Sequence, residues 1–464
     1  MDFRPNVRRL AFALLCGFLL VLLRLTYLQV FVAPRLQASP YNERDKARRA
    51  ATRRGSVFDR NDRVLARTQD LGEGVTQRMY PLDEAAAHVV GYSTRLYGQD
   101  GIERTQDDAL IAAGPYATSF KRLLSPRGVG CDVTLTLDAE AQRAVYTELA
   151  LRRGAAIALD VRTGEVLLMV SAPSFSPALL DEQWEDIRQR GDGALLNRAT
   201  ARRYPLGAAM QLIVATAAID SGVAQPTDTF TCPGSADVGG VRVACARRRG
   251  HGQVDLSTAL ALPCRTTFAK LADRVGADTL DLYIERFGLA DAPDIELAAR
   301  RSIVPRLSAR GTSDFMAACF EDNGVQVTPL AMCSAVASLA DGGTRMRPHL
   351  VASVSNANGR VLDKTVPRAV GVVCSPSTAA EMAELMASAV QRGTAERAGI
   401  PDVKVAGIAG SSPQSDDDGW TVWFIGFAPA DRPQVAVCVV IEEGSRSGQQ
   451  ATELGMSVLQ ALLR

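Results

Sequence analysis

The side chains that could carry catalysis are sparse in this sequence, and lysine is the scarcest of them. Acyl transfer by a serine needs a basic neighbour, and a lysine three residues later lies on the same face of a helix. The chain has five lysines, at Lys46, Lys121, Lys270, Lys364 and Lys404. The residues three positions before them are Glu43, Thr118, Thr267, Val361 and Pro401. The sequence therefore contains no S-x-x-K motif, and no G-x-S-x-G motif is present either.

Other hydroxyls and thiols are candidates for a nucleophile. Cys264 precedes Arg265, and a neighbouring cation favours the thiolate form of cysteine, although a packing role is the alternative interpretation. Ser411 and Ser412 form a hydroxyl pair with no base nearby in the sequence. Thr267 is followed three positions later by a lysine, a pair that is typical of an ordinary helix.

The nine cysteines lack the spacing of a dense disulfide scaffold. Cys232 and Cys245 flank a glycine-rich turn and are the candidate disulfide, with two free thiols as the alternative. Adding His251 gives three zinc-type ligands, but a fourth ligand is missing from the pattern. We therefore expect no bound metal, and no motif indicates another cofactor.

An apolar segment near the N-terminus predicts a membrane span. Residues 10–33 contain a single charge, Arg24, and would extend about 36 Å as a helix, which is enough to cross a bilayer. A cleavable signal peptide is the alternative, but no A-x-A site is visible. Arginines before the span predict that residues 1–9 lie in the cytoplasm and that the rest of the chain lies outside. Arg24 either reaches toward the outer interface or contacts a membrane partner.

Composition narrows the class of protein further. The 464 residues allow two to four domains, and the 47% hydrophobic content excludes a mainly disordered chain. Because 52 basic residues balance 51 acidic ones, a general attraction to nucleic acid is not expected.

Hydrophobic patterning predicts an α+β fold with an antiparallel sheet covered by helices. Residues 155–160 and 166–171 form one strand pair around a turn, and residues 420–427 and 435–441 form another. A further hairpin is expected around residues 59–62. Helices are predicted at residues 141–151, with Asp138 as the cap, and at 211–219, 330–339 and 456–463.

The order of several short motifs resembles the class B penicillin-binding proteins, which are membrane-anchored D,D-transpeptidases that cross-link peptidoglycan. Residues 54–61 read RGSVFDRN and are similar to the family segment R-G-x-I-x-D-R-x. Residues 135–138 read LTLD, and residues 159–167 read LDVRTGEVL, similar to the opening of the transpeptidase domain. Residues 423–429 read WFIGFAP and resemble W-F-x-G-F-x-P.

The resemblance implies a domain order. A transmembrane helix (10–33) would be followed by a small β-rich pedestal domain (34–147) and a transpeptidase-like domain (148–464). In the family, the span and pedestal contact a polytopic glycosyltransferase that polymerises glycan. The residues implied to make such a contact here are Arg24, Arg54, Asp59 and Arg60.

The resemblance also locates the three active-site motifs of the family, and the residue types differ in each of them. The corresponding positions are Ala208 and Gln211 for S-x-x-K, Pro263 and Arg265 for the outer residues of S-x-N, and Ile408, Ala409 and Gly410 for K-T-G. Alanine offers no nucleophile and glutamine no titratable base, and of K-T-G only the glycine is kept.

We therefore expect a catalytically inactive member of the family, not an enzyme, that scaffolds or regulates peptidoglycan synthesis at the plasma membrane for cell shape or cell division. One alternative is non-covalent binding of peptidoglycan stem peptides, in which Arg265 recognises a carboxylate. The other alternative is an active D,D-transpeptidase with an unconventional nucleophile.

Overall fold

A computed structural model describes most of the chain. The described residues are 4–29, 52–72, 76–94, 96–113, 116, 128–320, 324–413, 419–445 and 447–463. Two compact units are present. One comprises Met1–Arg53 with Arg127–Val129, and the other comprises Arg54–Pro126 with Gly130–Arg464.

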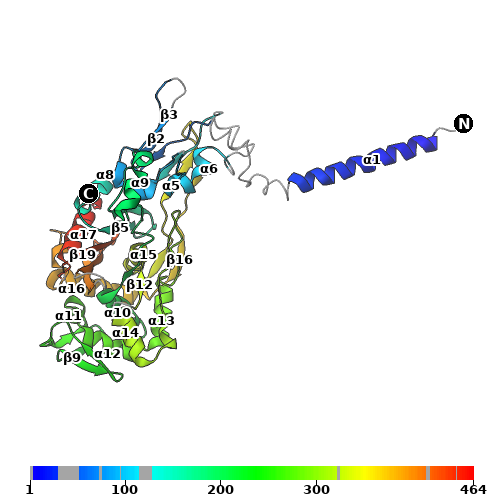
Figure 1. The fold of residues 1–464 in the computed structure, drawn as a ribbon. Helices are drawn as coiled ribbons and strands as arrows, with labels where there is room; N and C mark the ends of the chain where they lie inside the picture. The colour runs from blue at the N-terminus through cyan, green and yellow to red at the C-terminus, as the bar shows by residue number, and fades with distance from the viewer. Residues whose placement is uncertain are drawn as a thin grey trace. The chain divides into compact units, whose positions relative to one another are not determined.

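The first unit contains one long apolar helix, α1 (Arg4–Tyr27) (Figure 1). Its Leu10–Tyr27 segment has a mean hydropathy of 2.2 and is not buried by other parts of the chain. The 24-residue helix is about 36 Å long, which matches the thickness of a bilayer core. Arg24 lies over the ring of Tyr27, 5.6 Å from its centroid. Residues 30–33 of the expected span lie outside the described residues.

The second unit begins with a six-stranded pedestal sheet in the order β15-β14-β4-β1-β2-β3. Its strands are β1 (Val57–Phe58), β2 (Val64–Asp70), β3 (Thr76–Met79), β4 (Asp132–Leu135), β14 (Val351–Ser355) and β15 (Val361–Lys364). The antiparallel pairing of β1 with β2 confirms the hairpin that was expected there. Asp59 shapes its turn, because its carboxylate accepts hydrogen bonds from the backbone N–H groups of Asn61 and Arg63.

Two of these strands come from far along the chain. Strand β14 pairs antiparallel with β4, placing Val351 opposite Leu135. The pedestal sheet therefore includes residues beyond the 34–147 range that the sequence indicates. The expected boundary between residues 147 and 148 falls inside helix α8 (Ala139–Leu149). Asp138 caps this helix as predicted, accepting hydrogen bonds from Glu140 and Ala141 N–H groups.

Short helices and a second sheet complete the framework. The pedestal carries η2 (Asp83–Ala85), α4 (Ala87–Val90), α5 (Gly101–Thr105) and α6 (Asp107–Leu110). A five-stranded antiparallel sheet follows in the order β17-β18-β19-β5-β6. Its strands are β5 (Gly154–Asp160), β6 (Val166–Ala172), β17 (Ala406–Pro413), β18 (Trp420–Ala428) and β19 (Val435–Gly444). Both strand pairs predicted from the sequence are present, β5 with β6 and β18 with β19.

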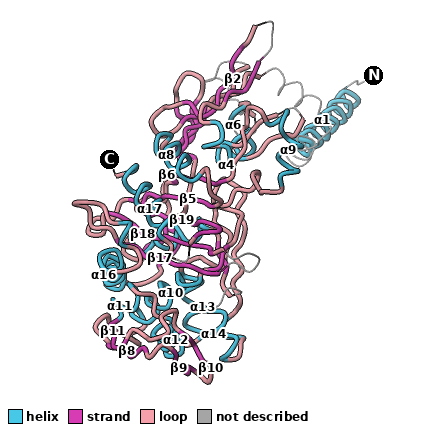
Figure 2. The backbone as a smooth tube through the Cα atoms, turned by 60° about the vertical axis from the view of Figure 1, so that its left-hand side comes forward, coloured by secondary structure: helices cyan, strands magenta, loops and turns pink. Residues whose placement is uncertain are grey.

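Helices cover both faces of this sheet, as an α+β fold requires (Figure 2). One face carries Phe424 and Val439 and packs with α8 and α17 (Gln449–Leu462). The other face carries Trp423 and Val440 and packs with α15 (Pro329–Ala340). Neighbouring strand residues belong to different cores because their side chains alternate between the two faces.

A helical lobe adjoins the edge strand β17. Its helices are α10 (Met210–Asp220), α11 (Leu256–Ala261), α12 (Arg265–Val275), α13 (Ala277–Arg286), α14 (Thr312–Phe320) and α16 (Pro376–Arg392). The lobe also contains two antiparallel strand pairs. One is β8 (Thr229–Cys232) with β11 (Gly252–Asp255), and the other is the hairpin of β9 (Ser235–Val238) with β10 (Val241–Ala244). The remaining elements are β7 (Tyr204–Pro205), η4 (Gly207–Ala209), α9 (Leu180–Arg190), η5 (Leu307–Ala309), β12 (Gln326–Val327), β13 (Thr344–Met346), β16 (Ala369–Val372) and η6 (Glu396–Ala398).

Candidate functional site

A groove with a cavity of about 390 Å³ lies beside the edge strand β17. Its wall combines segments that are far apart in the chain: the start of α10, the loop between β10 and β11, the turn before α12, and β17 itself. The lining residues are Gln211, Ala244, Cys245, Ala246, Arg248, Pro263, Arg265, Thr394, Ala409, Gly410, Ser411, Trp420 and Ser447.

The groove gathers most of the motif positions located in the sequence. Those that line it are Gln211, Pro263, Arg265, Ala409 and Gly410. Ile408 is instead buried in the core of the sheet. Ala208 belongs to η4, and its side chain lies outside the described residues.

Gly207 allows the start of α10 to approach β17 closely. Its φ of +50° lies in the left-handed region that glycine adopts at little cost. A Cβ at this position would lie 3.1 Å from Cβ of Ser412 and 3.2 Å from the carbonyl oxygen of Ser411. The width of this end of the groove therefore depends on a residue without a side chain.

The segment before Gly207 is fixed to the sheet by polar contacts. The indole N–H of Trp423 donates to the carbonyl oxygen of Pro205 at 3.0 Å. The hydroxyl of Tyr204 donates to Glu442 Oε1 at 2.8 Å, and desolvation together with this carboxylate raises the pKa of Tyr204 well above its usual value. These contacts hold β7 and the beginning of α10 against β18 and β19.

The charge of the groove is positive at two lining positions. Arg265 is the first residue of α12, an 11-residue helix, and Arg248 lies in the exposed loop after β10. Within the described part of the chain, neither guanidinium is paired with a carboxylate. The N-terminus of a helix adds further positive potential, so an anionic ligand is favoured here.

Only one of the two serines at the end of β17 lines the groove. Ser411 is half-buried in the wall, where its backbone is paired with Val422 of β18. Ser412 is fully buried and faces Gly207. Ser411 is thus the serine of the expected pair that a ligand in the groove can reach.

Cys264 does not face the groove. Its thiol is fully buried, and hydrogen bonds from Cys245 and from the hydroxyls of Thr266 and Thr267 lower the pKa of Cys264. Thr267 donates to this sulfur at 3.2 Å, whereas Lys270 donates to the carbonyl oxygen of Thr231. Thr267 and Lys270 therefore form no nucleophile–base pair, in agreement with the helix interpretation.

Comparison with known proteins assigns the chain to a family. The model of the penicillin-binding protein transpeptidase domain matches residues 154–460, about two thirds of the chain. The chain belongs to the penicillin-binding protein transpeptidase family. A second model, the dimerisation domain of penicillin-binding protein A, matches residues 54–125 of this penicillin-binding protein.

Related proteins match the penicillin-binding protein over nearly its full length. The peptidoglycan D,D-transpeptidase PbpA of Mycolicibacterium smegmatis is 30% identical over 99% of both chains. PbpA of Mycobacterium tuberculosis H37Rv is 29% identical over 99% of both chains. The structure of penicillin-binding protein A from M. tuberculosis as a ceftriaxone acyl-enzyme has a TM-score of 0.82 and 28% identity, covering 90% of this chain and 99% of that one.

These relatives correct one expectation from the sequence. We predicted that the chain is not an enzyme, because its motif positions lack a serine and a lysine. Its relatives contradict that prediction, since they are named D,D-transpeptidases and one of them is an acyl-enzyme in its solved structure. The prediction took the changed side chains of the three motifs as decisive, whereas the relationship to these transpeptidases extends over 99% of the chain and indicates an enzyme.

The residues expected to contact a partner differ in their exposure. Arg54 is largely buried and is ion-paired with Glu103 and Asp107, and Asp59 is fully buried in its turn. Arg60 keeps 39% of its side chain exposed. A direct partner contact is therefore a prediction for Arg60, whereas Arg54 and Asp59 hold the pedestal together.

The structure also supplies a residue that the cysteine analysis missed. Cys232 and Cys245 are free thiols in the structure, which is the alternative that the sequence left open, and each sulfur lies 3.5 Å from Nδ1 of His251. Cys264 joins them, and the four ligand atoms lie within 4.8 Å of one another. Cys264 was not recognised as the fourth member from the sequence, because it lies 19 residues after Cys245.

Proposed function

We propose that this penicillin-binding protein acts in peptidoglycan synthesis at the membrane and that its groove binds the peptide stem of peptidoglycan. The observation that carries the proposal is the combination, in one groove, of an edge strand with two arginines that have no carboxylate partner among the described residues.

The edge strand provides the first element of recognition. Strand β17 is paired with β18 on one side only, so the backbone groups along its other side are available to an extended peptide. Gly410 lines the groove and has no side chain to hold a ligand backbone away. A stem peptide that adds to this edge gains backbone hydrogen bonds whatever its side chains are.

The arginines provide the second element. A stem peptide that ends in D-alanine carries a terminal carboxylate, and a guanidinium binds a carboxylate through two parallel hydrogen bonds. Arg265 is placed for this role at the N-terminus of α12, and Arg248 adds charge from the facing loop.

The test is binding of a pentapeptide stem ending in D-Ala-D-Ala to the full chain in detergent. We expect Arg265→Ala to weaken binding about tenfold or more, because a charge-assisted bidentate pair contributes roughly 1.5–3 kcal/mol. Arg247→Ala is the matched control, since Arg247 lies beside Arg248 in the sequence but does not line the groove. Equal affinity of the C-terminal amide of the peptide would contradict the proposal.

A second candidate function is the acyl transfer that the names of the relatives indicate. We propose Ser411 as its nucleophile, because this hydroxyl lines the groove. Its Oγ would bond to the carbonyl carbon of the penultimate D-alanine. The C–N bond to the terminal D-alanine would break, and the hydroxyl proton would pass to the departing amine.

Labelling with a fluorescent penicillin, followed by intact mass measurement, tests acyl transfer separately from binding. A covalent adduct that is lost in Ser411→Ala supports Ser411. Absence of any adduct, together with no release of D-alanine from the stem peptide, excludes the acyl-transfer candidate and leaves the binding proposal standing.

We also propose a location and a partner. The apolar helix α1 would anchor the chain in the plasma membrane with its N-terminus in the cytoplasm, because arginines precede the span. A polytopic glycosyltransferase is the proposed partner, contacted through α1 and the exposed Arg60. Protection of a cysteine introduced at position 2 from a membrane-impermeant thiol reagent tests the orientation in a Cys16→Ser background.

A further inference from the structure

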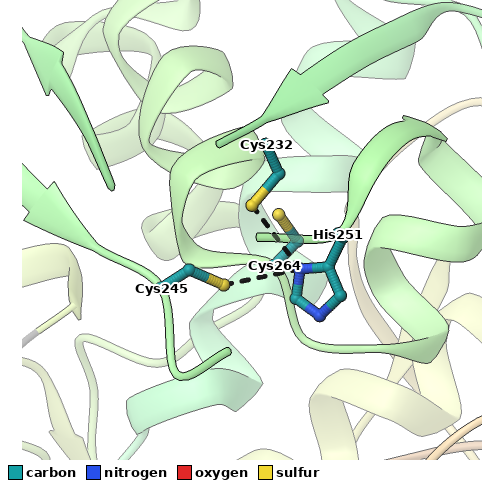
Figure 3. A group of neighbouring side chains, drawn as sticks. All are labelled: Cys232, Cys245, His251 and Cys264. Atoms are coloured by element: carbon teal, nitrogen blue, oxygen red, sulfur yellow. Dashed lines mark hydrogen bonds between the residues drawn. The ribbon is translucent and has the colours of Figure 1, made fainter. Parts of the chain in front are cut away.

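Three cysteines and a histidine converge beside the groove wall. Figure 3 shows the sulfurs of Cys232, Cys245 and Cys264 gathered around the ring of His251. His251 Nδ1 lies 3.5 Å from the sulfur of Cys232 and 3.5 Å from that of Cys245. The three cysteines are each less than 5% exposed, so water reaches the cluster poorly.

The spacing of these atoms fits one kind of occupant. Tetrahedral zinc has Zn–S bonds of about 2.3 Å and Zn–N bonds of about 2.0–2.1 Å, which places sulfur about 3.5 Å from nitrogen and about 3.8 Å from sulfur. The two S···N distances to His251 in the structure, both 3.5 Å, equal the first of these values. All four ligand atoms lie within 4.8 Å of one another, so a small movement closes the tetrahedron.

The backbone conformation around the cluster places His251 close to Cys232. Cys232 ends β8, and the backbone N–H of His251 donates to its carbonyl oxygen at 3.1 Å. Gly250 has a φ of +74°, and a Cβ there would lie 2.2 Å from that same carbonyl oxygen. Only glycine allows this approach, which brings His251 against Cys232.

We propose that Cys232, Cys245, His251 and Cys264 form a structural site for one Zn²⁺ ion. Three thiolates and one imidazole are soft and borderline ligands that select zinc over magnesium or calcium. Four protein ligands close the coordination shell, so this is a structural rather than a catalytic type of site. The hydroxyl of Thr267 donates to the sulfur of Cys264 and orients that ligand.

The site has a consequence for the groove. Cys264 stands between Pro263 and Arg265, both of which line the groove, and Cys245 lines it too. Cys264 also immediately precedes α12, as its N-cap residue. A zinc ion bound here would fix the wall that carries Arg265. The metal proposal stands on the ligand geometry alone and does not depend on peptide binding.

The principal competitor for the same sulfurs is a disulfide between Cys232 and Cys245. It would use two of the thiols and leave Cys264 and His251 side by side without a bond. The zinc site uses all four groups, and two of its S···N distances already have the tetrahedral value. The two states are distinguishable, because the disulfide makes the intact chain lighter by two hydrogens and holds no metal.

The test is the metal content of the full chain, purified in detergent without chelators and measured by plasma mass spectrometry. We expect about one zinc per chain, and a loss of tenfold or more in zinc affinity for Cys232→Ser. Cys374→Ala is the matched control, because Cys374 is equally buried but lies outside the cluster, and it should retain the zinc.

Two further measurements keep the proposal testable if Cys232→Ser does not fold. His251→Ala removes the least buried ligand and should fold while binding zinc at least tenfold more weakly. Apoprotein of the unmodified chain titrated with Co²⁺ should develop the intense visible bands of tetrahedral thiolate coordination. A reduced apoprotein that binds neither Zn²⁺ nor Co²⁺, or a purified chain with a Cys232–Cys245 disulfide, would overturn the proposal.

Discussion

Arg198 and Glu442 form an ion pair in which both side chains are 3% exposed, with Nε 3.0 Å from Oε1. The pair joins the segment before β7 to β19, two elements separated by 244 residues. Arg198 also donates to the backbone carbonyl oxygens of Asp192 and Gly193. The buried Arg198 guanidinium therefore has a carboxylate and two carbonyl oxygens as partners, and it links the segment before β7 to the sheet.

Removing the carboxylate of this pair should destabilise the protein strongly. Glu442→Gln leaves the Arg198 guanidinium buried without a counter-charge, and breaking a buried pair in this way costs about 3–5 kcal/mol. We expect a clear fall in the thermal unfolding temperature of the full chain. Glu443→Gln is the control, because its pair with Arg153 is exposed and should contribute less than about 1 kcal/mol. Equal effects of both substitutions would contradict the ion-pair argument.

Gly207 should be sensitive to the smallest side chain. Gly207→Ala adds a Cβ 3.1 Å from Ser412 Cβ and places a non-glycine residue at φ +50°, which together should lower stability by about 1–2 kcal/mol. Stem-peptide affinity should fall as well, because the turn shifts toward the groove. Gly222→Ala separates the two causes, since Gly222 has a φ of +71° with no atom near its Cβ position. If both variants lose affinity equally, crowding at Ser412 is not the reason.

Local patterns predicted much of the fold, and distant pairings did not follow from them. The β5–β6 and β18–β19 hairpins were readable because the turn and both strands are contiguous in the sequence. The pairing of β14 with β4 joins residues more than 200 positions apart, and no local signal marks it.

The sequence likewise predicted part of the candidate site and missed another part. Five of the positions that the family motifs indicated line the groove, because the motifs follow the order of the segments along the chain. Their side-chain types led to the wrong conclusion that the chain is not an enzyme. The fourth member of the cysteine cluster was missed because its position depends on how α12 begins relative to β8, which sequence spacing does not reveal.

His88 should make the stability of the pedestal depend on pH. Burial of the ring lowers the pKa of His88 to about 4, and its Nε2–H donates to the carbonyl oxygen of Ala194 at 2.7 Å. In the unfolded chain a histidine has a pKa of about 6.5. The unfolded state therefore takes up the proton first, and the free energy of unfolding falls as the pH drops from about 6.5 toward 4.

The size of this effect follows from the difference between the two pKa values. It amounts to about 3 kcal/mol at and below pH 4. His88→Gln keeps a donor for Ala194 and cannot be protonated, so its thermal unfolding should respond less to pH over the same range. An unchanged pH profile in His88→Gln would show that other groups cause the acid sensitivity.

Substitutions at two pedestal arginines should distinguish a role in stability from a role in partner binding. Arg60 is partly exposed and its ion pair with Glu165, at 3.5 Å, should contribute less than about 1 kcal/mol. Arg60→Ala should leave the unfolding temperature nearly unchanged and reduce co-purification of a glycosyltransferase from membranes. Arg54→Ala should instead lower stability, because it removes the ion pairs that Arg54 makes with Glu103 and Asp107 and leaves Glu103 paired with Arg78. Loss of co-purification only in the unstable variant would exclude Arg60 from the interface.

Removal of zinc should weaken ligand binding in the groove, because Cys264 directly precedes Arg265. If zinc fixes this residue, apoprotein should unfold at a lower temperature and bind the stem peptide more weakly, because Arg265 begins α12 directly after Cys264. The affinity of Arg265→Ala should fall much less on metal removal, since the side chain that the metal positions is already absent. An unmodified chain that loses zinc with no change in peptide affinity would mean that the metal stabilises the lobe without positioning the arginine.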